Sequence, residues 1–184
     1  MKIGIISDSH GAFGDFKKAY DFLEDADYIL HLGDVLYHGP RNDLPDGYDP
    51  KSLAELIKND DRFIFIKGNC DSEVDEMVTA KKIEDKYLLL EFDNFKFLLS
   101  HGHRKNINSE ISGAESKGYD GFFYGHTHVK RLEKDKILVL NPGSTSIPKD
   151  CCKSFALYED GTFYLYNLED LSIIKLVKMA GEDE

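Results

Sequence analysis

Five short polar motifs, each placed directly after a run of apolar residues, constrain this 184-residue chain more than any other feature. A short apolar run that gives way to glycine and polar residues is typical of a buried strand passing into a loop. Because the carboxyl ends of parallel strands meet at one edge of a sheet, we expect the motifs to converge in space. The motifs are Asp8-Ser9-His10, Gly33-Asp34, Gly68-Asn69-Cys70-Asp71, Ser100-His101-Gly102-His103 and Gly125-His126-Thr127-His128.

The first half of the chain alternates apolar runs with segments of helical periodicity. The runs predict strands over 2–7, 28–32 and 62–66, and the periodic segments predict helices over 13–25 and 53–58. Residues 40–50 contain three prolines and several charges, so a loop is expected there. This βαβαβ order predicts parallel strands joined by helical crossovers.

The second half favours hairpins. The pattern predicts paired strands over 86–92 with 95–99, within 130–140, and over 155–158 with 162–166, together with a helix over 108–117, a strand over 121–124 and an edge strand over 173–177. All the elements together predict an α/β fold, a four-layer αββα sandwich in which two mixed sheets are flanked by helices. The length predicts a single domain over residues 1–184.

The side chains of the motifs are suited to binding metal ions. Residues i and i+2 of a strand point the same way, so Asp8 can act with His10, and His126 with His128. One such pair alone is a weak signal, but five of the seven histidines fall within the motifs. Carboxylate, amide and imidazole ligands suit Mn, Fe, Zn or Mg, and two such ions close together hydrolyse phosphate esters.

Composition limits the partners and the compartment. The net charge of −11 disfavours long nucleic acid, and no basic stripe with interleaved aromatic residues is present. No apolar run is long enough for a membrane helix, and the first residues do not resemble a secretory signal, so no membrane partner is expected. The three cysteines, two of them the neighbours Cys151 and Cys152, make no disulfide framework, which favours a cytoplasmic location.

The motif series resembles the calcineurin-like metallophosphoesterase superfamily. That family has the pattern D-X-H, G-D, G-N-(H or C)-D, H-G-H and G-H-X-H, which residues 1 to about 145 follow in order. Within the superfamily the chain is similar to the small bacterial phosphodiesterases of the YfcE type. The segments GDVLYHGPRNDLP at 33–45, GNCDSEVD at 68–75 and NPGSTSIPK at 141–149 carry this closer resemblance.

The resemblance implies two divalent metal ions, with manganese favoured and Zn, Fe, Ni or Mg left open. It assigns Asp8, His10 and His128 to the first ion, Asn69, His101 and His126 to the second, and Asp34 to a bridging position. In the family pattern His103 lies beside the site. Asp34 and Asn69 count as catalytic as well as metal-binding. Asp71 and Asn141 could orient the ligands from behind.

Cys70 occupies a position where many superfamily members have histidine. A histidine there can protonate the leaving group, whereas a neutral thiol is a weak donor, so we expect a preference for aryl esters. His103 or His38 could supply the proton instead. The loop that contains His38 and Arg41 is expected either to line the substrate pocket or to form an interface between subunits. Arg41 and Lys67 are candidates for phosphate contacts, with a solvated surface charge as the alternative for each. His31, inside a strand, is expected to be a core or sheet-face residue.

These features together predict a metal-dependent phosphodiesterase that attacks a small phosphodiester with a hydroxide bridging the two ions. A phosphomonoesterase or nucleotide hydrolase is the alternative within the same chemistry. A non-catalytic interaction scaffold is the alternative from another class, and the complete ligand set speaks against it. Loop 36–50 and the C-terminal strand are candidate contacts for a homodimer or a larger homo-oligomer.

Overall fold

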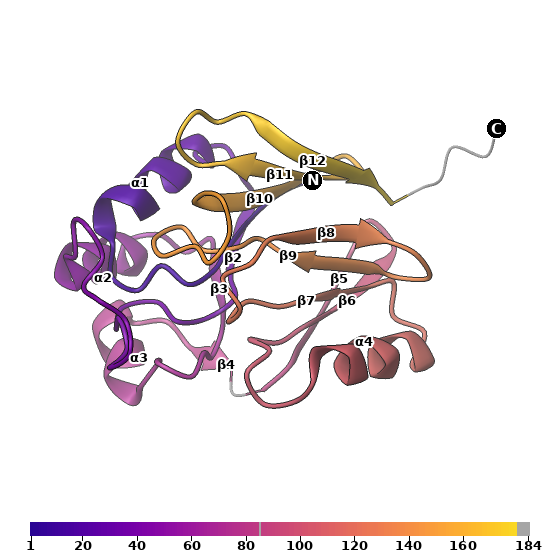
Figure 1. Cartoon of the computed structure of the whole chain (residues 1–184), viewed down its shortest axis with the longest axis horizontal. Helices are drawn as coiled ribbons and strands as arrows, with labels where there is room; N and C mark the ends of the chain where they lie inside the picture. Colours follow the sequence, from indigo (N-terminus) through magenta and orange to yellow (C-terminus); the bar gives the residue numbers. More distant parts are fainter. Residues whose placement is uncertain (85, 180–184) are drawn as a thin grey trace.

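The computed structural model describes residues 1–84 and 86–179 and contains two mixed sheets (Figure 1). The first has the order β12-β11-β10-β1-β2-β3-β4, formed by Ile173–Lys178, Thr162–Asn167, Ser154–Glu159, Lys2–Ile6, Tyr28–His31, Phe63–Ile66 and Ile83–Glu84. The second has the order β5-β6-β7-β9-β8, formed by Leu88–Phe92, Phe95–Leu99, Gly121–Phe123, Leu138–Asn141 and Arg131–Lys134. Four helices complete the described fold: α1 (Phe13–Phe22), α2 (Pro50–Lys58), α3 (Glu73–Thr79) and α4 (Ile107–Ser116).

Parallel strands form the centre of each sheet. In the first sheet β1, β2, β3 and β4 run parallel and are joined through α1, α2 and α3. In the second sheet β6, β7 and β9 run parallel, and β5 and β8 pair antiparallel at the edges. The five polar motifs follow the carboxyl ends of β1, β2, β3, β6 and β7, as the sequence predicts.

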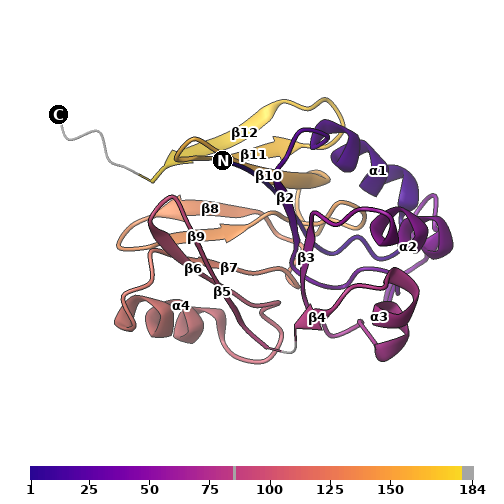
Figure 2. The same ribbon diagram turned by 180° about the vertical axis from the view of Figure 1, so that it is seen from behind.

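Three apolar clusters define four layers, which confirms the predicted αββα sandwich. The two sheets face each other across a core that includes Ile5, Phe97 and Phe163. Helices α1 and α2 cover the outer face of the first sheet through residues such as Phe16. Helix α4 covers the outer face of the second sheet through Ala114, and Figure 2 shows these helices on opposite sides of the molecule.

Local sequence explains where the helices begin and end. Helix α2 begins earlier than the predicted residue 53, because Pro50 occupies its first turn and the Asp49 side chain accepts the Ser52 N–H at 3.0 Å. The prediction that the first helix continues to residue 25 is wrong, because α1 ends at Phe22. The Arg62 guanidinium donates to the carbonyl oxygens of Leu23 and Glu24, so these backbone acceptors beyond the helix end have hydrogen-bond partners.

Helix α3 and strand β4 were not predicted from the sequence. Helix α3 exposes Val74, Met77 and Val78, so it lacks the buried apolar stripe by which a helix is recognised. It is instead fixed at its start by a capping box between Ser72 and Asp75. No helix among residues 1–84 and 86–179 is long and apolar enough to cross a membrane.

Candidate metal centre

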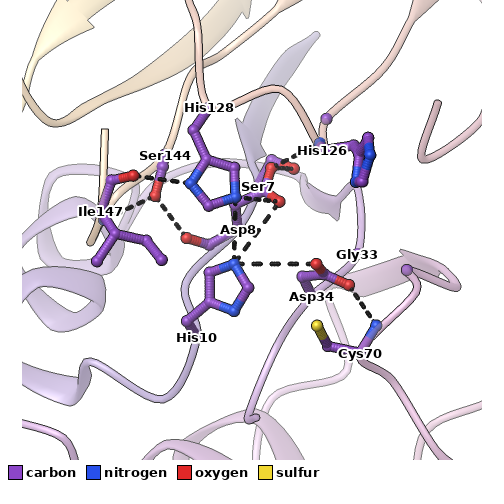
Figure 3. A network of polar contacts seen from close by, with 12 residues as sticks. Ser7, Asp8, His10, Gly33, Asp34, Cys70, His126, His128, Ser144 and Ile147 are labelled. Atoms are coloured by element: carbon purple, nitrogen blue, oxygen red, sulfur yellow. Dashed lines mark hydrogen bonds and ion pairs between the residues drawn. The ribbon is translucent and has the colours of Figure 1, made fainter. Parts of the chain in front are cut away.

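The predicted ligands converge between the loops that follow β1, β2, β3, β6 and β7 (Figure 3). Three overlapping groups of side chains have ligand atoms within 4.8 Å of one another. The groups are Asp8 with His10 and His128, Asp34 with His101 and His126, and His10 with Asp34 and Cys70. Asp34 therefore belongs to two of the three groups.

Backbone carbonyls orient three of the imidazoles. His10 Nδ1 lies 2.8 Å from the Tyr37 carbonyl oxygen, and His128 Nδ1 lies 2.7 Å from that of Ile147. His101 Nδ1 lies 2.6 Å from the carbonyl oxygen of Leu32. A carbonyl only accepts, so each Nδ1 carries the hydrogen, and in the neutral ring each Nε2 presents a lone pair.

These Nε2 atoms point at one another and at carboxylates, which is an arrangement of acceptors. His10 Nε2 lies 3.3 Å from His128 Nε2, and His128 Nε2 lies 3.2 Å from Asp8 Oδ1 (Figure 3). His101 Nε2 lies 3.4 Å from Asp34 Oδ2. Asp8 Oδ1 is buried and has no hydrogen-bond partner among the described residues. Lone pairs gathered in this way need a cation between them, so the donor set fits metal ions.

The buried carboxylates of the site attract positive charge. Burial disfavours charge on His101, yet its contacts with Asp34 and Asp8 raise its pKa to about 9. Burial also disfavours charge on Asp34, but His101 and the Cys70 N–H outweigh it and lower the pKa of that carboxyl. Burial opposes ionisation of Asp8 as well, but His128 and His101 lower its pKa. Asp8 and Asp34 are thus anionic in the interior and require positive charge nearby, which ions or imidazolium groups can supply.

Five of the ligand residues adopt left-handed backbone angles that non-glycine residues seldom take. They are Asp8, His10, Asp34, His126 and His128, with φ between 45° and 65°. Such angles persist only where neighbouring contacts impose them, and they gather at functional sites. Here the backbone N–H of His126 donates to Asp8 Oδ2 at 3.0 Å, so one strained loop is fixed by the other.

Asn69 and His103 occupy different positions relative to the ligands. Asn69 Oδ1 lies 3.2 Å from His101 Nε2, so it joins the second group. The His103 ring is centred 5.3 Å from that of His101, and His103 does not line the cavity that Asn69 and His126 line. Burial and the nearby His101 lower the pKa of His103 to about 4, which keeps this imidazole neutral.

A cavity of about 550 Å³ opens over the ligand groups. Among the residues predicted to touch the substrate, Arg41 and Cys70 line it, whereas His38 and Lys67 do not. His38 packs edge-on between Tyr37 and Tyr48. Lys149, the last residue of the 141–149 segment, also lines the cavity and was not predicted to do so. A lysine placed directly after such a polar segment was the available signal.

Asp71 and Asn141, which were expected to orient the imidazoles, form hydrogen bonds with backbone groups instead. Asp71 accepts backbone N–H groups of the Asp34 loop, and Asn141 Nδ2 donates to the Gly125 carbonyl oxygen at 2.9 Å. His31 is fully buried, as predicted for a core residue, and burial lowers its pKa to about 3. Its Nδ1 accepts the Gly33 N–H, so Nε2 carries the hydrogen and donates to Ser9 Oγ.

A family model of the calcineurin-like phosphoesterase superfamily domain matches residues 1–161. The chain therefore belongs to the calcineurin-like phosphoesterase superfamily. Phosphodiesterase YfcE of Escherichia coli strain K12 is 35% identical over 182 residues, which cover 96% of this chain and 97% of that relative. Phosphodiesterase MJ0936 of Methanocaldococcus jannaschii is 30% identical over 162 residues, which cover 83% and 85% of the two chains.

Similarity to a solved structure confirms the fold. The structure of YfcE, a phosphoesterase from E. coli, matches this chain with a TM-score of 0.87 and 32% sequence identity. The match covers 98% of this chain and all of the other. The two mixed sheets and flanking helices are thus the fold of this family, and the predicted family resemblance is confirmed.

Proposed function

We propose that this protein is a metal-dependent phosphodiesterase that hydrolyses a small phosphodiester at a site for two divalent ions. The observation that carries the proposal is the convergence of imidazole lone pairs and buried carboxylates at the strand ends, with Asp34 shared between two ligand groups. The relatives YfcE and MJ0936 are both named phosphodiesterases, which favours a diester substrate over a monoester.

The proposed ligands of the first ion are Asp8, His10 and His128, and those of the second are Asn69, His101 and His126, with Asp34 common to both. Bound ions would lower the pKa of coordinated water and neutralise charge on the phosphate. The carbonyl partners of His10 and His128 would keep their Nε2 atoms turned toward the ion.

The side chains that line the cavity are proposed to handle the substrate. Arg41 and Lys149 approach it from separate loops and provide positive charge for the phosphate oxygens. Burial, followed by the effect of the Asp34 carboxylate, raises the pKa of Cys70 to about 12. The Cys70 thiol would therefore stay protonated at neutral pH and act only as a weak donor. A contact of His38 with substrate stays a prediction, because His38 lies outside the cavity lining.

Three further predictions rest on the sequence. We propose manganese as the working metal because oxygen and imidazole ligands dominate the site, and Zn, Fe, Ni and Mg are the competitors. We propose a single domain and a cytoplasmic location, the latter because all three cysteines are free thiols. A homodimer is proposed to use loop 36–50, where Tyr37 and Leu44 are exposed, or the exposed face of β12.

The proposal is tested by stripping the protein with a chelator and adding back Mn, Zn, Fe, Mg or Ni. Hydrolysis of bis(p-nitrophenyl) phosphate is then compared with that of p-nitrophenyl phosphate. We expect metal-restored activity on the diester and little on the monoester. A preference for the monoester would favour a phosphomonoesterase, and tight metal binding without activity on either would favour a scaffold.

Two variants connect the activity to the proposed site. Asp34→Asn removes the shared carboxylate and should abolish the metal-restored activity. Asp46→Asn removes the same charge from an exposed position and should leave the activity near that of the natural protein. A fully active Asp34→Asn variant would refute the assignment of Asp34.

A further inference from the structure

Cys151 and Cys152 form a pair of neighbouring thiols that the proposed hydrolysis does not use. Their Sγ atoms lie 3.3 Å apart, Cys151 is exposed and Cys152 is half-buried. The bond between two disulfide sulfurs is about 2.05 Å long, so the atoms need to approach by only about 1.3 Å. The pair is accessible to small oxidants and nearly in bonding contact.

The segment before this pair holds a proposed metal ligand. The Ile147 carbonyl oxygen accepts from His128 Nδ1 at 2.7 Å, and the Lys149 N–H donates to the His128 carbonyl oxygen at 3.0 Å. Segment 147–149 therefore contacts His128 at both its ring and its backbone.

Lys130, which directly precedes β8, connects the cysteine segment to the chain that follows His128. The Asp150 carboxylate accepts the Lys130 N–H at 2.8 Å, and the Cys152 carbonyl oxygen accepts from Lys130 Nζ at 2.7 Å. A change of backbone conformation at 151–152 would disturb the hydrogen bonds of Lys130 with Asp150 and with the Cys152 carbonyl oxygen. Lys130 is two residues beyond His128, so the disturbance reaches the metal ligand from a second direction.

We propose that Cys151 and Cys152 are a reversible oxidation site, at which a hydroperoxide forms a disulfide that weakens metal binding through His128. The Cys151 thiolate attacks the outer oxygen of the hydroperoxide, so that an S–O bond forms, the O–O bond breaks and the sulfur becomes a sulfenic acid. The other oxygen takes up a proton and leaves as an alcohol or water. The Cys152 thiol then displaces the hydroxyl group as water and the S–S bond forms. Two thiols are oxidised and one peroxide bond is reduced.

The covalent geometry makes this disulfide easy to reduce. Neighbouring residues joined by a trans peptide have Cα atoms about 3.8 Å apart, whereas disulfide-linked residues usually have them about 4.4–6.8 Å apart. The eight-membered ring is therefore strained, and strained disulfides have more oxidising potentials. This accounts for free thiols under reducing conditions and makes the oxidised form a temporary state.

The first experiment counts thiols and does not depend on the proposed function. Treating the full chain with hydrogen peroxide should lower the number of titratable thiols from three to one, with loss of the mass of two hydrogen atoms. A peptide joined internally at 151–152 should appear in the digest, and dithiothreitol should restore all three thiols. The Cys151→Ser variant should form no such peptide. Retention of three thiols, or a disulfide that involves Cys70, would overturn the oxidation site.

The second experiment tests the coupling, which rests on the proposed metal site. Titration with Mn²⁺, an ion that avoids thiolates, should give an affinity about 10–100-fold weaker for the oxidised than for the reduced protein, the range found when a ligand loses its outer partner. The Cys151→Ser, Cys152→Ser double variant retains Cys70 and should bind Mn²⁺ equally before and after peroxide.

The two ways in which this can fail are distinguishable. Equal Mn²⁺ affinity of the oxidised and reduced natural protein would overturn the coupling while leaving the metal site intact. Absence of Mn²⁺ binding by the reduced protein would overturn the proposed metal site and the coupling together. An equal loss of affinity in the double variant would assign the effect to Cys70 and also overturn the proposal.

Discussion

The carboxylate of Asp71 accepts the backbone N–H of Asp34 at 2.9 Å, and so fixes the loop that presents the central carboxylate of the site. The same carboxylate accepts the N–H groups of Val35 at 2.8 Å and Gly68 at 2.7 Å. It thereby joins the loops after β2 and β3. Burial, with the nearby Asp34 charge, raises the pKa of Asp71 to about 6 although these hydrogen bonds oppose the rise.

Replacing Asp71 with alanine should destabilise the protein by about 2–4 kcal/mol, because three buried N–H groups lose their acceptor together. The free energy of unfolding in urea, measured at pH 7, checks this. Asp61→Ala is the matched control, since Asp61 is fully exposed and its ion pair with Lys81 should contribute less than about 1 kcal/mol. Equal effects of the two substitutions would show that Asp71 does not support these loops.

Gly68→Ala should displace Asp34 and weaken metal binding about 10–100-fold. A Cβ at position 68 would lie 2.1 Å from Asp34 Oδ1 and 2.4 Å from the Asp34 backbone nitrogen. The backbone cannot move aside as a flexible side chain could, so the carboxylate has to shift. Titration with Mn²⁺ measures the effect.

Gly113→Ala is the control for this glycine substitution. Gly113 lies in α4 and a Cβ there would meet nothing within 4 Å. Alanine is the better helix former, so this variant should be about 0.5–1 kcal/mol more stable, with unchanged metal affinity. Unchanged affinity in Gly68→Ala as well would mean that the position of Asp34 does not govern metal binding.

The sequence predicted the elements that carry the site because each strand ends in a motif of strong chemical character. The run Phe63–Ile66 ends just before Gly68-Asn69, and its strand lies where it was expected. Helix α3 could not be predicted from periodicity, because Val74 and Met77 face solvent. The two residues of β4 are too few to give a pattern, and they pair with β3 only after the sheet has formed.

The side chains proposed as metal ligands could be named from the sequence, but the groups that orient them could not. His10 and His128 can be recognised in the sequence by residue type and spacing, and their side chains lie together in the structure. Their partners are the carbonyls of Tyr37 and Ile147, and a carbonyl group is common to every residue. Such contacts depend on the path of the backbone, so the sequence could not show which oxygens hold these imidazoles.

Cys70→His should increase the hydrolysis of alkyl diesters about 10–100-fold more than that of aryl diesters. A histidine at this cavity position can protonate a poor leaving group, whereas the Cys70 thiol, with its pKa raised to about 12 by burial, is a weak donor. Rates on bis(p-nitrophenyl) phosphate would be compared with those on a dialkyl phosphodiester followed by phosphorus NMR.

The Cys70→Ala variant separates proton donation from packing. It should leave the aryl rate nearly unchanged, because a nitrophenolate leaves without protonation. If histidine at position 70 changed both rates by the same factor, the leaving-group role of this position would be refuted. A large fall of the aryl rate in Cys70→Ala would instead assign the Cys70 side chain to packing around Asn69, whose Nδ2 lies 3.2 Å from Cys70 Sγ.

The ion pair between Asp60 and Arg62, which lies away from the proposed metal site, should make the free energy of unfolding depend on pH. Asp60 accepts from Arg62 Nε at 3.0 Å, from Arg62 Nη2 at 2.6 Å and from the Tyr20 hydroxyl at 2.9 Å. Burial opposes ionisation, but the Arg62 hydrogen bonds outweigh it and lower the pKa of Asp60 to about 2. The unfolded value is about 3.9.

Because the folded pKa is the lower one, this stabilisation is fully present above about pH 4 and is lost as the pH falls toward 2. Asp60→Asn should therefore reduce the free energy of unfolding by about 2 kcal/mol at pH 7 and by progressively less between pH 4 and 2. Urea unfolding of both proteins across this range measures the difference. Asp25→Asn, which removes the exposed partner of Lys2, should show a much smaller and salt-sensitive change. A difference for Asp60→Asn that stayed constant from pH 7 to 2 would mean that ionisation of Asp60 does not stabilise the fold.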